Sequence, residues 1–282
     1  MTGRIDLALP ESQYHQHPAL SSTQARKLLE SPARYRWDRD HPQAGKQTFD
    51  VGTAVHTKVL GVGAGTVEYP DEHVTASGAV STKAATVAWA EEQRAAGFTP
   101  IAPAQAARVN GMAEAVLAHP TARALLEQSG HSEASVFATD TDTGTPMRAR
   151  FDRLNDDVAI DLKTTAKTAS VDGFMRTVAA YGYDVQQEFY LHALEQAGEP
   201  RRPFRFIVVE SEAPHLVAVH ELDVEYQQMG AAKVHRALEL YATCTATNTW
   251  PGYDPTVQLV SPPTWAVYEH EDEYGPLHGI EF

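Results

Sequence analysis

The sequence predicts an α/β fold in which helices flank a mixed central sheet and an N-terminal part is mainly helical. Three observations lead to this prediction. Runs that alternate between polar and apolar residues, as half-buried strands do, gather between residues 132 and 222. Segments with helix start and stop signals precede, interrupt and follow these runs. The chain of 282 residues is long enough for one large domain with a substantial core.

Capping signals define the helices of the N-terminal part. Ser21, with Gln24 three residues later, predicts a capping box at the start of a first helix. Ser31 followed by Pro32 predicts the start of a second, because proline suits the first helical position. Further on, the sequence predicts a loop or arm with two short strand-like pieces and then three helices. These segments are 61–82 for the arm, and 83–96, 103–118 and 121–128 for the helices.

The remaining elements follow in chain order. Strands are predicted at 132–139, 146–154 and 158–164, helices at 170–180 and 184–197, strands at 204–210 and 216–222, and a long helix at 224–243. The tail from Trp250 is rich in Pro, Gly and aromatic residues, and we expect irregular coil there. We therefore expect a single domain with three parts, which are a mainly helical part (1–130), the sheet and helices that carry the candidate site (131–245) and an irregular C-terminal tail (246–282).

The strongest candidate site lies on the hairpin between the second and third strands. Residues 155–157 are Asn-Asp-Asp, which are turn formers. In a hairpin centred on residues 156 and 157, the numbers of facing residues sum to 313. Asp152 then faces Asp161, and Arg150 faces Lys163. Because side chains at i and i+2 share a face, Asp161 and Lys163 point the same way as Asp152.

Two carboxylates that face each other across a ladder repel, and a bound cation reverses the sign of that interaction. Mg²⁺ typically takes one or two carboxylates together with phosphate oxygens of a substrate. The alternative is a surface hairpin whose charges are only solvated. Ile160 and Leu162 favour the metal site, because their alternation with the charged residues indicates a strand packed on the core.

Other polar residues can join this cluster. Glu133 lies in an alternating run that can pair as a neighbouring strand and add a third carboxylate, although a solvent-facing glutamate is the alternative. His56 follows Gly52 in an apolar-rich segment and is either a ligand or a packed histidine. Gln186 and Tyr190, at i and i+4 of a predicted helix, project together and can hydrogen-bond a phosphate or a base edge. Their alternative is a polar helix flank.

Taken together, the ordered residues resemble the PD-(D/E)XK nuclease superfamily, in particular its RecE / exonuclease VIII branch. The resemblance covers nearly the whole chain and rests on His56, Glu133, Asp152, the triplet Asp161-Leu162-Lys163, and Gln186-x-x-x-Tyr190. It implies a restriction-endonuclease-like core, a Mg²⁺ requirement for which Mn²⁺ is a candidate substitute, and degradation of linear double-stranded DNA from an end.

The resemblance also implies roles for these residues. The metal would be held by the carboxylates of Glu133, Asp152 and Asp161 and by the Leu162 backbone carbonyl. His56 would either ligate a second ion or position the nucleophile. Lys163 would orient the attacking water or offset charge in the transition state. Gln186 and Tyr190 would position the strand, and Arg148 or Arg150 would contact phosphate. Iron–sulfur branches of the superfamily need four cysteines, whereas this chain has only Cys244, so we expect no such cluster.

The charge distribution bears on nucleic-acid binding. The net charge is −14, but residues 1–60 carry eight Lys/Arg against six Asp/Glu, which leaves −16 for the remainder. Arg34 and Arg36 alternate with Tyr35 and Trp37, a basic and aromatic run that predicts a surface in contact with a DNA strand. The alternative is an ordinary charged helix face.

Several expectations concern partners and location. The resemblance admits a ring-shaped homo-oligomer and a single-strand annealing protein of phage recombination as partner. The sequence has no apolar run that could span a bilayer and no signal-peptide pattern at its N-terminus, so we expect no membrane association and a cytoplasmic location, in the bacterial host if the chain is phage-encoded. Two alternatives to the exonuclease are an endonuclease of the same superfamily and a non-catalytic DNA-end-binding recombination scaffold.

Overall fold

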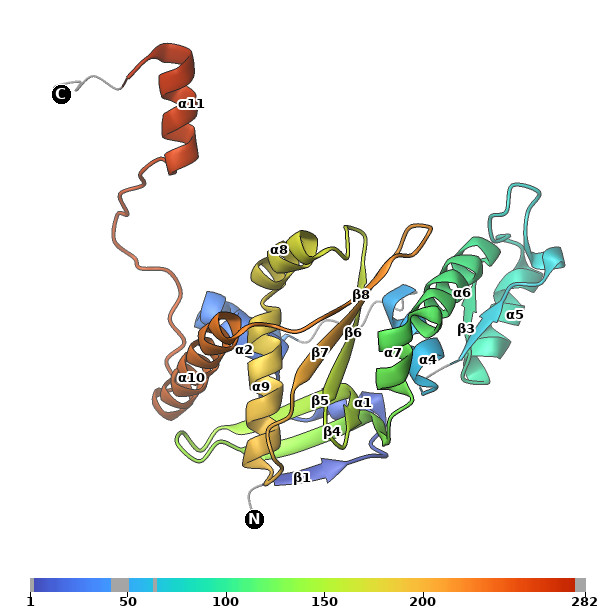
Figure 1. The fold of residues 1–282 in the computed structure, drawn as a ribbon, viewed down its shortest axis with the longest axis horizontal. Helices are drawn as coiled ribbons and strands as arrows, with labels where there is room; N and C mark the ends of the chain where they lie inside the picture. Colours follow the sequence, from blue (N-terminus) through green and yellow to red (C-terminus); the bar gives the residue numbers. More distant parts are fainter. Residues whose placement is uncertain (1–2, 42–50, 63–64, 277–282) are drawn as a thin grey trace.

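The alternating runs of the second half of the chain form a six-stranded mixed sheet in the computed structural model, which describes residues 3–41, 51–62 and 65–276 (Figure 1). The strand order is β1-β4-β5-β6-β7-β8, and only β6 and β7 run parallel among these neighbours. The strands are β1 (Gly3–Asp6), β4 (Gly130–Thr139), β5 (Pro146–Asn155), β6 (Ala159–Thr165), β7 (Phe204–Glu210) and β8 (Val217–His220). The predicted α/β fold with a mixed sheet is therefore confirmed.

The register of the β5–β6 hairpin is the predicted one, but its ladder is short. Arg153 pairs with Ile160 and Leu154 with Ala159, and both pairs sum to 313. The ladder stops there, while on its other edge β6 pairs with β7 along its whole length. The prediction that Asp152 and Asp161 are ladder partners is wrong. A backbone N–H of β6 donates to the side chain of Asp152 instead of to the backbone of β5. Asp152 Oδ2 accepts the Leu162 N–H at 2.7 Å.

The predicted pairing of Arg150 with Lys163 is also wrong, because the β5–β6 ladder does not extend to these two residues. Arg150 turns to its other neighbour, β4, where it pairs with Ser135. Within β4, the position of Glu133 opposite Asp152 drops out of the ladder, and Glu133 adopts a left-handed φ of 57°. The ladder keeps the same register on both sides, so this residue bends the strand without shifting it.

One face of the sheet is covered by helices from both ends of the chain. They are α2 (Ser22–Glu30), α3 (Pro32–Asp40), α9 (Tyr183–Gln196) and α10 (Val224–Thr247). The predicted capping box of Ser21 and Gln24 is present, and Pro32 begins α3 as predicted. Phe151, Phe189 and Phe206 are fully buried between these helices and the sheet.

The opposite face is covered by α4 (Val51–Leu60), α6 (Pro103–Ala118) and α7 (Pro120–Leu126). Ile160 and Leu162 of β6 are fully buried in this second core together with Val55 of α4. The burial of these two residues confirms that β6 is packed on the core. Since β6 side chains alternate, Asp161 and Lys163 point to the other face.

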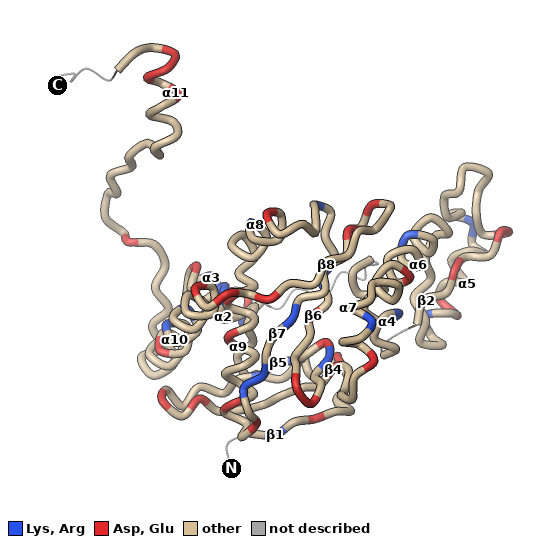
Figure 2. The backbone as a smooth tube through the Cα atoms, viewed as in Figure 1, with Lys and Arg blue, Asp and Glu red and all other residues tan. Residues whose placement is uncertain are grey.

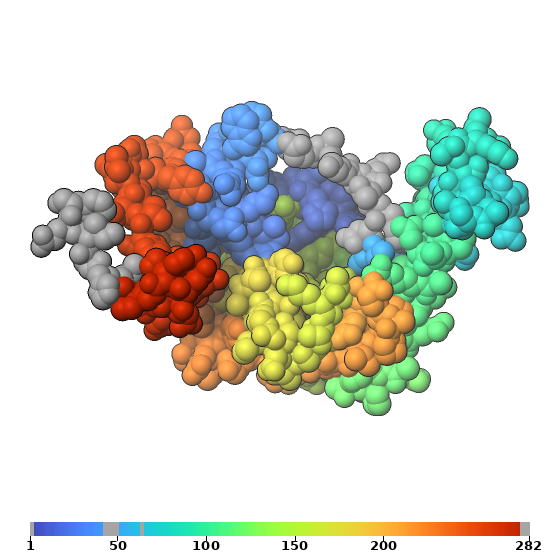
Figure 3. Space-filling view, turned by 90° about the horizontal axis from the view of Figure 1, so that it is seen from above, coloured from blue at the N-terminus to red at the C-terminus, as the bar shows by residue number. Residues whose placement is uncertain are grey.

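The remaining elements surround this three-layer body. Residues 65–101 hold η1 (Asp71–His73), α5 (Ala84–Ala95) and a small parallel sheet of β2 (Thr66–Glu68) and β3 (Thr99–Ile101), and they protrude at one end (Figure 3). Helix α8 (Val171–Tyr181) leads into α9. Acidic residues lie along the peripheral loops and helices, whereas β5 and β7 carry basic residues (Figure 2). No helix in the described ranges is long and apolar enough to cross a membrane.

Two parts of the chain differ from the expected elements. The tail from Trp250 is not entirely irregular, because Thr264–Tyr274 forms helix α11, which stands away from the body (Figure 1). Pro262-Pro263 followed by eleven residues without Gly or Pro is the signal that this helix leaves in the sequence. The short elements β1 and α1 (Glu11–Gln16) were not expected either.

Candidate metal centre

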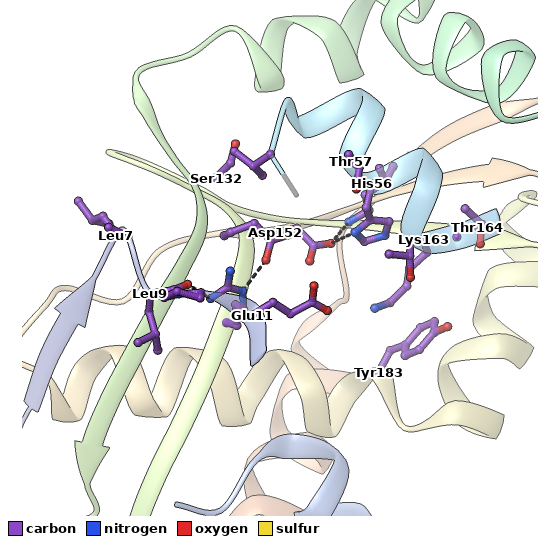
Figure 4. Close-up of a pocket in the computed structure, with 18 residues that line it drawn as sticks. Leu7, Leu9, Glu11, His56, Thr57, Ser132, Asp152, Lys163, Thr164 and Tyr183 are labelled. Carbon is purple, nitrogen blue, oxygen red and sulfur yellow. Dashed lines mark hydrogen bonds and ion pairs between the residues drawn. The ribbon is translucent and has the colours of Figure 1, made fainter. Parts of the chain in front are cut away.

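The point where β6 leaves β5 opens into a pocket of about 600 Å³ (Figure 4). Helix α4 forms one side with Thr53, His56 and Thr57, and the end of β6 with Tyr183 of α9 forms another. The N-terminal segment 7–11 closes a third side. The acidic and histidine residues predicted from the sequence therefore come from elements that are far apart in the chain and meet at one break in the sheet.

His56, Glu133 and Asp152 form the candidate cation site. Each offers a ligand atom, and these atoms lie within 4.8 Å of one another. His56 Nδ1 is 3.5 Å from Asp152 Oδ2. Two carboxylates and an imidazole suit a divalent ion such as Mg²⁺ or Mn²⁺. The three residues thus fit a metal, and the predicted convergence of Glu133 and His56 on Asp152 is what the structure shows.

The electrostatics of Asp152 favour a cation beside it. Burial raises the pKa of this carboxyl to about 6 and outweighs the lowering by His56 and Lys163, while the negative charge of Asp161 adds to the rise. When burial disfavours the ionised form of a carboxylate, a bound positive ion stabilises that form the most.

Asp161 lies in the same neighbourhood but is held by other partners. It is 2% exposed, and its Oδ1 accepts a hydrogen bond from Gln186 Nε2 at 2.5 Å. Its Oδ2 is 2.6 Å from Lys163 Nζ. Asp161 is not among the three residues whose ligand atoms cluster within 4.8 Å. The predicted ligand set is therefore divided, and the roles of Asp161 and of the Leu162 carbonyl as ligands stay predictions.

Lys163 is kept charged at this position. Burial alone would lower the pKa of its amine, but the carboxylates of Asp161 and Asp152 overcome this effect and raise it. The ammonium also lies 4.7 Å from the centre of the Tyr183 ring. The pocket therefore presents a fixed cation beside the candidate metal ligands, which is where a phosphate oxygen would need a counter-charge.

Arg150 and Arg148 make contacts within the protein. Arg150 donates to Glu133 Oε2 at 2.5 Å, to Ser135 Oγ at 2.6 Å and to the Leu9 carbonyl at 3.0 Å. Arg148 is 5% exposed and donates to the backbone carbonyl of Tyr14. Arg150 thus orients one of the candidate metal ligands. Phosphate contact by either arginine stays a prediction.

Gln186 and Tyr190 project toward the sheet as expected for i and i+4, but into the protein. Gln186 is buried against Asp161. The Tyr190 ring packs against Phe151 at 5.1 Å between centroids, and burial raises the pKa of its hydroxyl well above the usual value. Tyr190 and Arg148 also line a second pocket of about 360 Å³. The predicted DNA contacts of Gln186 and Tyr190 remain untested by this geometry.

The basic run on α3 is only partly free to attract DNA. Arg34 is exposed, but Arg36 Nε lies 2.7 Å from a carboxylate oxygen of Asp40. The guanidinium carbon of Arg36 also lies 5.6 Å from the centre of the Trp250 ring. Lys27 of α2 pairs in the same way with Asp38 at 2.6 Å. The ion pairs neutralise part of the surface, and strand contact by Arg34 and Arg36 stays a prediction.

The sequence reasoning missed the N-terminal wall of the pocket and Tyr183. Glu11 reaches from this wall toward the cluster (Figure 4), and its pKa is lowered by hydrogen bonding to His15, with Arg150 and His56 nearby. The alternation in Arg4-Ile-Asp-Leu7 and the Pro10-Glu11 pair were the signals for a strand and a helix start. Nothing in them indicated that the segment would lie across β5.

The comparisons with known proteins agree with this architecture. The family model described as "PDDEXK-like domain of unknown function (DUF3799)" matches residues 21–260. A solved structure of a "putative exonuclease" from Eubacterium rectale superposes with a TM-score of 0.58 at 12% identity, covering 96% of this chain and 100% of that one. This likeness shows the fold. Among curated proteins, none matches the sequence of this chain.

Proposed function

The chain belongs to the family of PDDEXK-like domains of unknown function, and we propose that it is a Mg²⁺-dependent exodeoxyribonuclease that degrades linear double-stranded DNA from its ends. The observation that carries the proposal is the joint placement of His56, Glu133 and Asp152 beside the cation of Lys163. The exonuclease named for the similar Eubacterium rectale structure supports the choice of activity.

The residues divide the work of phosphodiester hydrolysis between them. His56, Glu133 and Asp152 would hold the ion, and a bound divalent ion polarises a phosphate oxygen and lowers the pKa of a water. Lys163 would pair with a phosphate oxygen, where a fixed positive charge stabilises the negative charge that grows in the transition state. Asp161 holds the Lys163 ammonium at 2.6 Å, and Gln186 fixes Asp161 in turn. Arg150 aims the Glu133 carboxylate into the pocket.

The two alternatives are weaker on the same observations. A DNA-end-binding scaffold has no need of a buried carboxylate whose pKa is raised to about 6, nor of an ammonium fixed beside it. An endonuclease uses the same chemistry, and only the substrate decides between the two enzymes. The annealing-protein partner, the ring-shaped oligomer and the role in recombination remain predictions of the family resemblance.

The test uses end-labelled linear duplex and closed circular duplex, each with Mg²⁺ and with chelator. The exonuclease proposal expects loss of linear DNA only, and only with Mg²⁺. Glu133→Gln should abolish the activity, whereas Glu30→Gln, an exposed residue of α2, should leave it unchanged. Nicking of circles would indicate the endonuclease. Binding without cleavage under every condition would indicate the scaffold.

A further inference from the structure

The wall formed by residues 7–11, which we term the strap, separates the pocket from the edge of the sheet. All five of its residues, Leu7 to Glu11, line the pocket. The strap leaves β1, crosses β5 and continues into α1. Figure 4 shows Leu7 and Leu9 on one side of the cluster, with Lys163, Thr164 and Tyr183 on the other.

The strap is fastened to the sheet. Arg150 holds the Leu9 carbonyl at 3.0 Å, and Arg148 holds the carbonyl of Tyr14 in α1. The Tyr14 ring is buried and lies 5.0 Å from the Arg148 guanidinium and 5.6 Å from that of Arg150. The strap is therefore a fixed wall. Arg150 fastens it with the same guanidinium that orients Glu133.

The two sides of the pocket differ in what they offer to a nucleic-acid backbone. On the far side stand the Lys163 ammonium and the hydroxyls of Thr164 and Tyr183. The strap instead consists of the apolar residues Leu7, Ala8, Leu9 and Pro10 and of Glu11, whose carboxylate reaches toward the cluster. The Arg150 guanidinium is engaged by Glu133, Ser135 and Leu9. Among the described residues that line the pocket, the far side attracts a phosphate through Lys163, whereas the strap side offers the like charge of Glu11 and an Arg150 guanidinium that is already paired.

The size of the pocket adds a limit on length. A cube of about 600 Å³ has edges of about 8 Å, whereas one strand of a duplex carries a phosphate for about every 3.4 Å of helix axis, so the pocket holds no more than the first few nucleotides of a strand. A strand that enters past Lys163 and crosses the cluster thus reaches the strap after a few nucleotides. Its next phosphate would have to pass the apolar wall and Glu11.

We propose that the strap is a stop that lets only a free strand end occupy the pocket, so that residues 7–11 determine the end specificity of the enzyme. The inference deepens the proposed nuclease function and rests on it. It also says from which side a strand enters the pocket. The strand enters past Lys163 and Tyr183, and its terminal nucleotide lies against Leu9 and Pro10.

The test compares a strap variant, Leu7→Ala/Leu9→Ala/Glu11→Ala, with a matched control on the exposed face of α1, Ser12→Ala/Gln13→Ala/Gln16→Ala. The substrates are a linear duplex with free ends and the same duplex closed by hairpin caps at both ends. We expect wild type and control to degrade only the free-ended DNA. Relative to its rate on free-ended DNA, the strap variant should cleave capped DNA at least about tenfold above the background rate of the control, which corresponds to about 1.4 kcal/mol removed from the barrier. Circular dichroism and urea unfolding check that each protein is folded.

A strap variant that stays as dependent on free ends as the control would overturn the inference. That result leaves the exonuclease proposal standing. Cleavage of capped DNA by wild type would also overturn the inference, and it would indicate the endonuclease instead of the exonuclease. If no protein cleaves any DNA, the nuclease proposal fails. The affinities for free-ended and capped duplex then still test whether the strap acts as a stop. In Ca²⁺, wild type should then bind free-ended duplex about tenfold more tightly than capped duplex, and the strap variant should bind both equally. Equal binding by wild type contradicts the stop.

Discussion

The raised pKa of Asp152 predicts how the stability of the metal-free protein depends on pH. In the unfolded chain the carboxyl titrates near its usual value of 3.8, whereas in the folded protein its pKa is about 6. Between these values the folded state binds more protons than the unfolded state, so the free energy of unfolding falls as pH rises through this window. The contribution of Asp152 is thus present below about pH 4 and lost above pH 6.

The magnitude follows from the two pKa values. One pKa unit corresponds to about 1.36 kcal/mol, so the rise from 3.8 to about 6 gives up to about 3 kcal/mol. Asp152→Asn removes the titration and keeps an oxygen that can accept the Leu162 N–H. The difference in unfolding free energy, wild type minus variant, should therefore be constant above pH 7 and rise by up to about 3 kcal/mol on acidification to pH 4.

The assay is urea denaturation of both proteins in chelator from pH 4 to 8. Taking the difference between the two proteins cancels the titration of all other groups that behave alike in both. The reasoning fails if the two stability curves run parallel over the whole range, or if wild type loses stability relative to Asp152→Asn as the pH falls. Addition of Mg²⁺ supplies an internal check, because the ion binds the ionised carboxylate and should stabilise wild type more at pH 8 than at pH 5.

Further predictions concern other parts of the molecule. Asp161→Ala should abolish cleavage and also lower the unfolding free energy by up to about 3 kcal/mol, because it removes the closest carboxylate from the half-buried ammonium of Lys163; wild-type stability of the variant would contradict this. Mg²⁺ at a hundred times its dissociation constant should stabilise wild type by about 2.7 kcal/mol and Glu133→Gln far less, and an equal rise in melting temperature in both would place the ion elsewhere. Arg34→Ala should lower the slope of log affinity against log salt by about 0.9 if the exposed arginine meets duplex, and an unchanged slope would make it a solvated helix residue. A chain that ends after Gly252 should match wild type in urea, whereas one that ends before Trp250 should lose about 1.5–3 kcal/mol, because the indole packs on α3 and α10.

The parts of the fold that sequence predicts well are those with local signals. The caps of α2 and α3 need only residues three positions apart, and both form as expected. The hairpin register was predictable because the turn residues 155–157 and the apolar alternation of β6 agree on one pairing. These signals act within a few residues, so no knowledge of the rest of the molecule is needed.

What the sequence could not predict depends on contacts between distant segments. The Asp152–Asp161 ladder pair is lost where the Asp152 side chain, rather than the β5 backbone, accepts the Leu162 N–H. Arg150 reads as a phosphate contact in the sequence, yet it binds the Leu9 carbonyl and Glu133. A backbone carbonyl leaves no residue-specific signal, so the fastening of the strap by this arginine was invisible.

The end of the β5–β6 ladder after Arg153 and Ile160 explains why the candidate site has two unlike carboxylates. Asp161 stays on a strand that is paired along its length with β7, and its oxygens are taken by Gln186 and Lys163. Asp152 lies on β5, beyond the end of its ladder with β6. Its carboxylate accepts one backbone hydrogen bond, and burial raises its pKa. The fixed carboxylate thus positions a cation of the protein, while the destabilised one is available for a cation from solution. Without metal, the protein therefore loses stability relative to its Asn variant as the pH rises from about 4 to above 6, and an ion bound between His56, Glu133 and Asp152 would restore that stability.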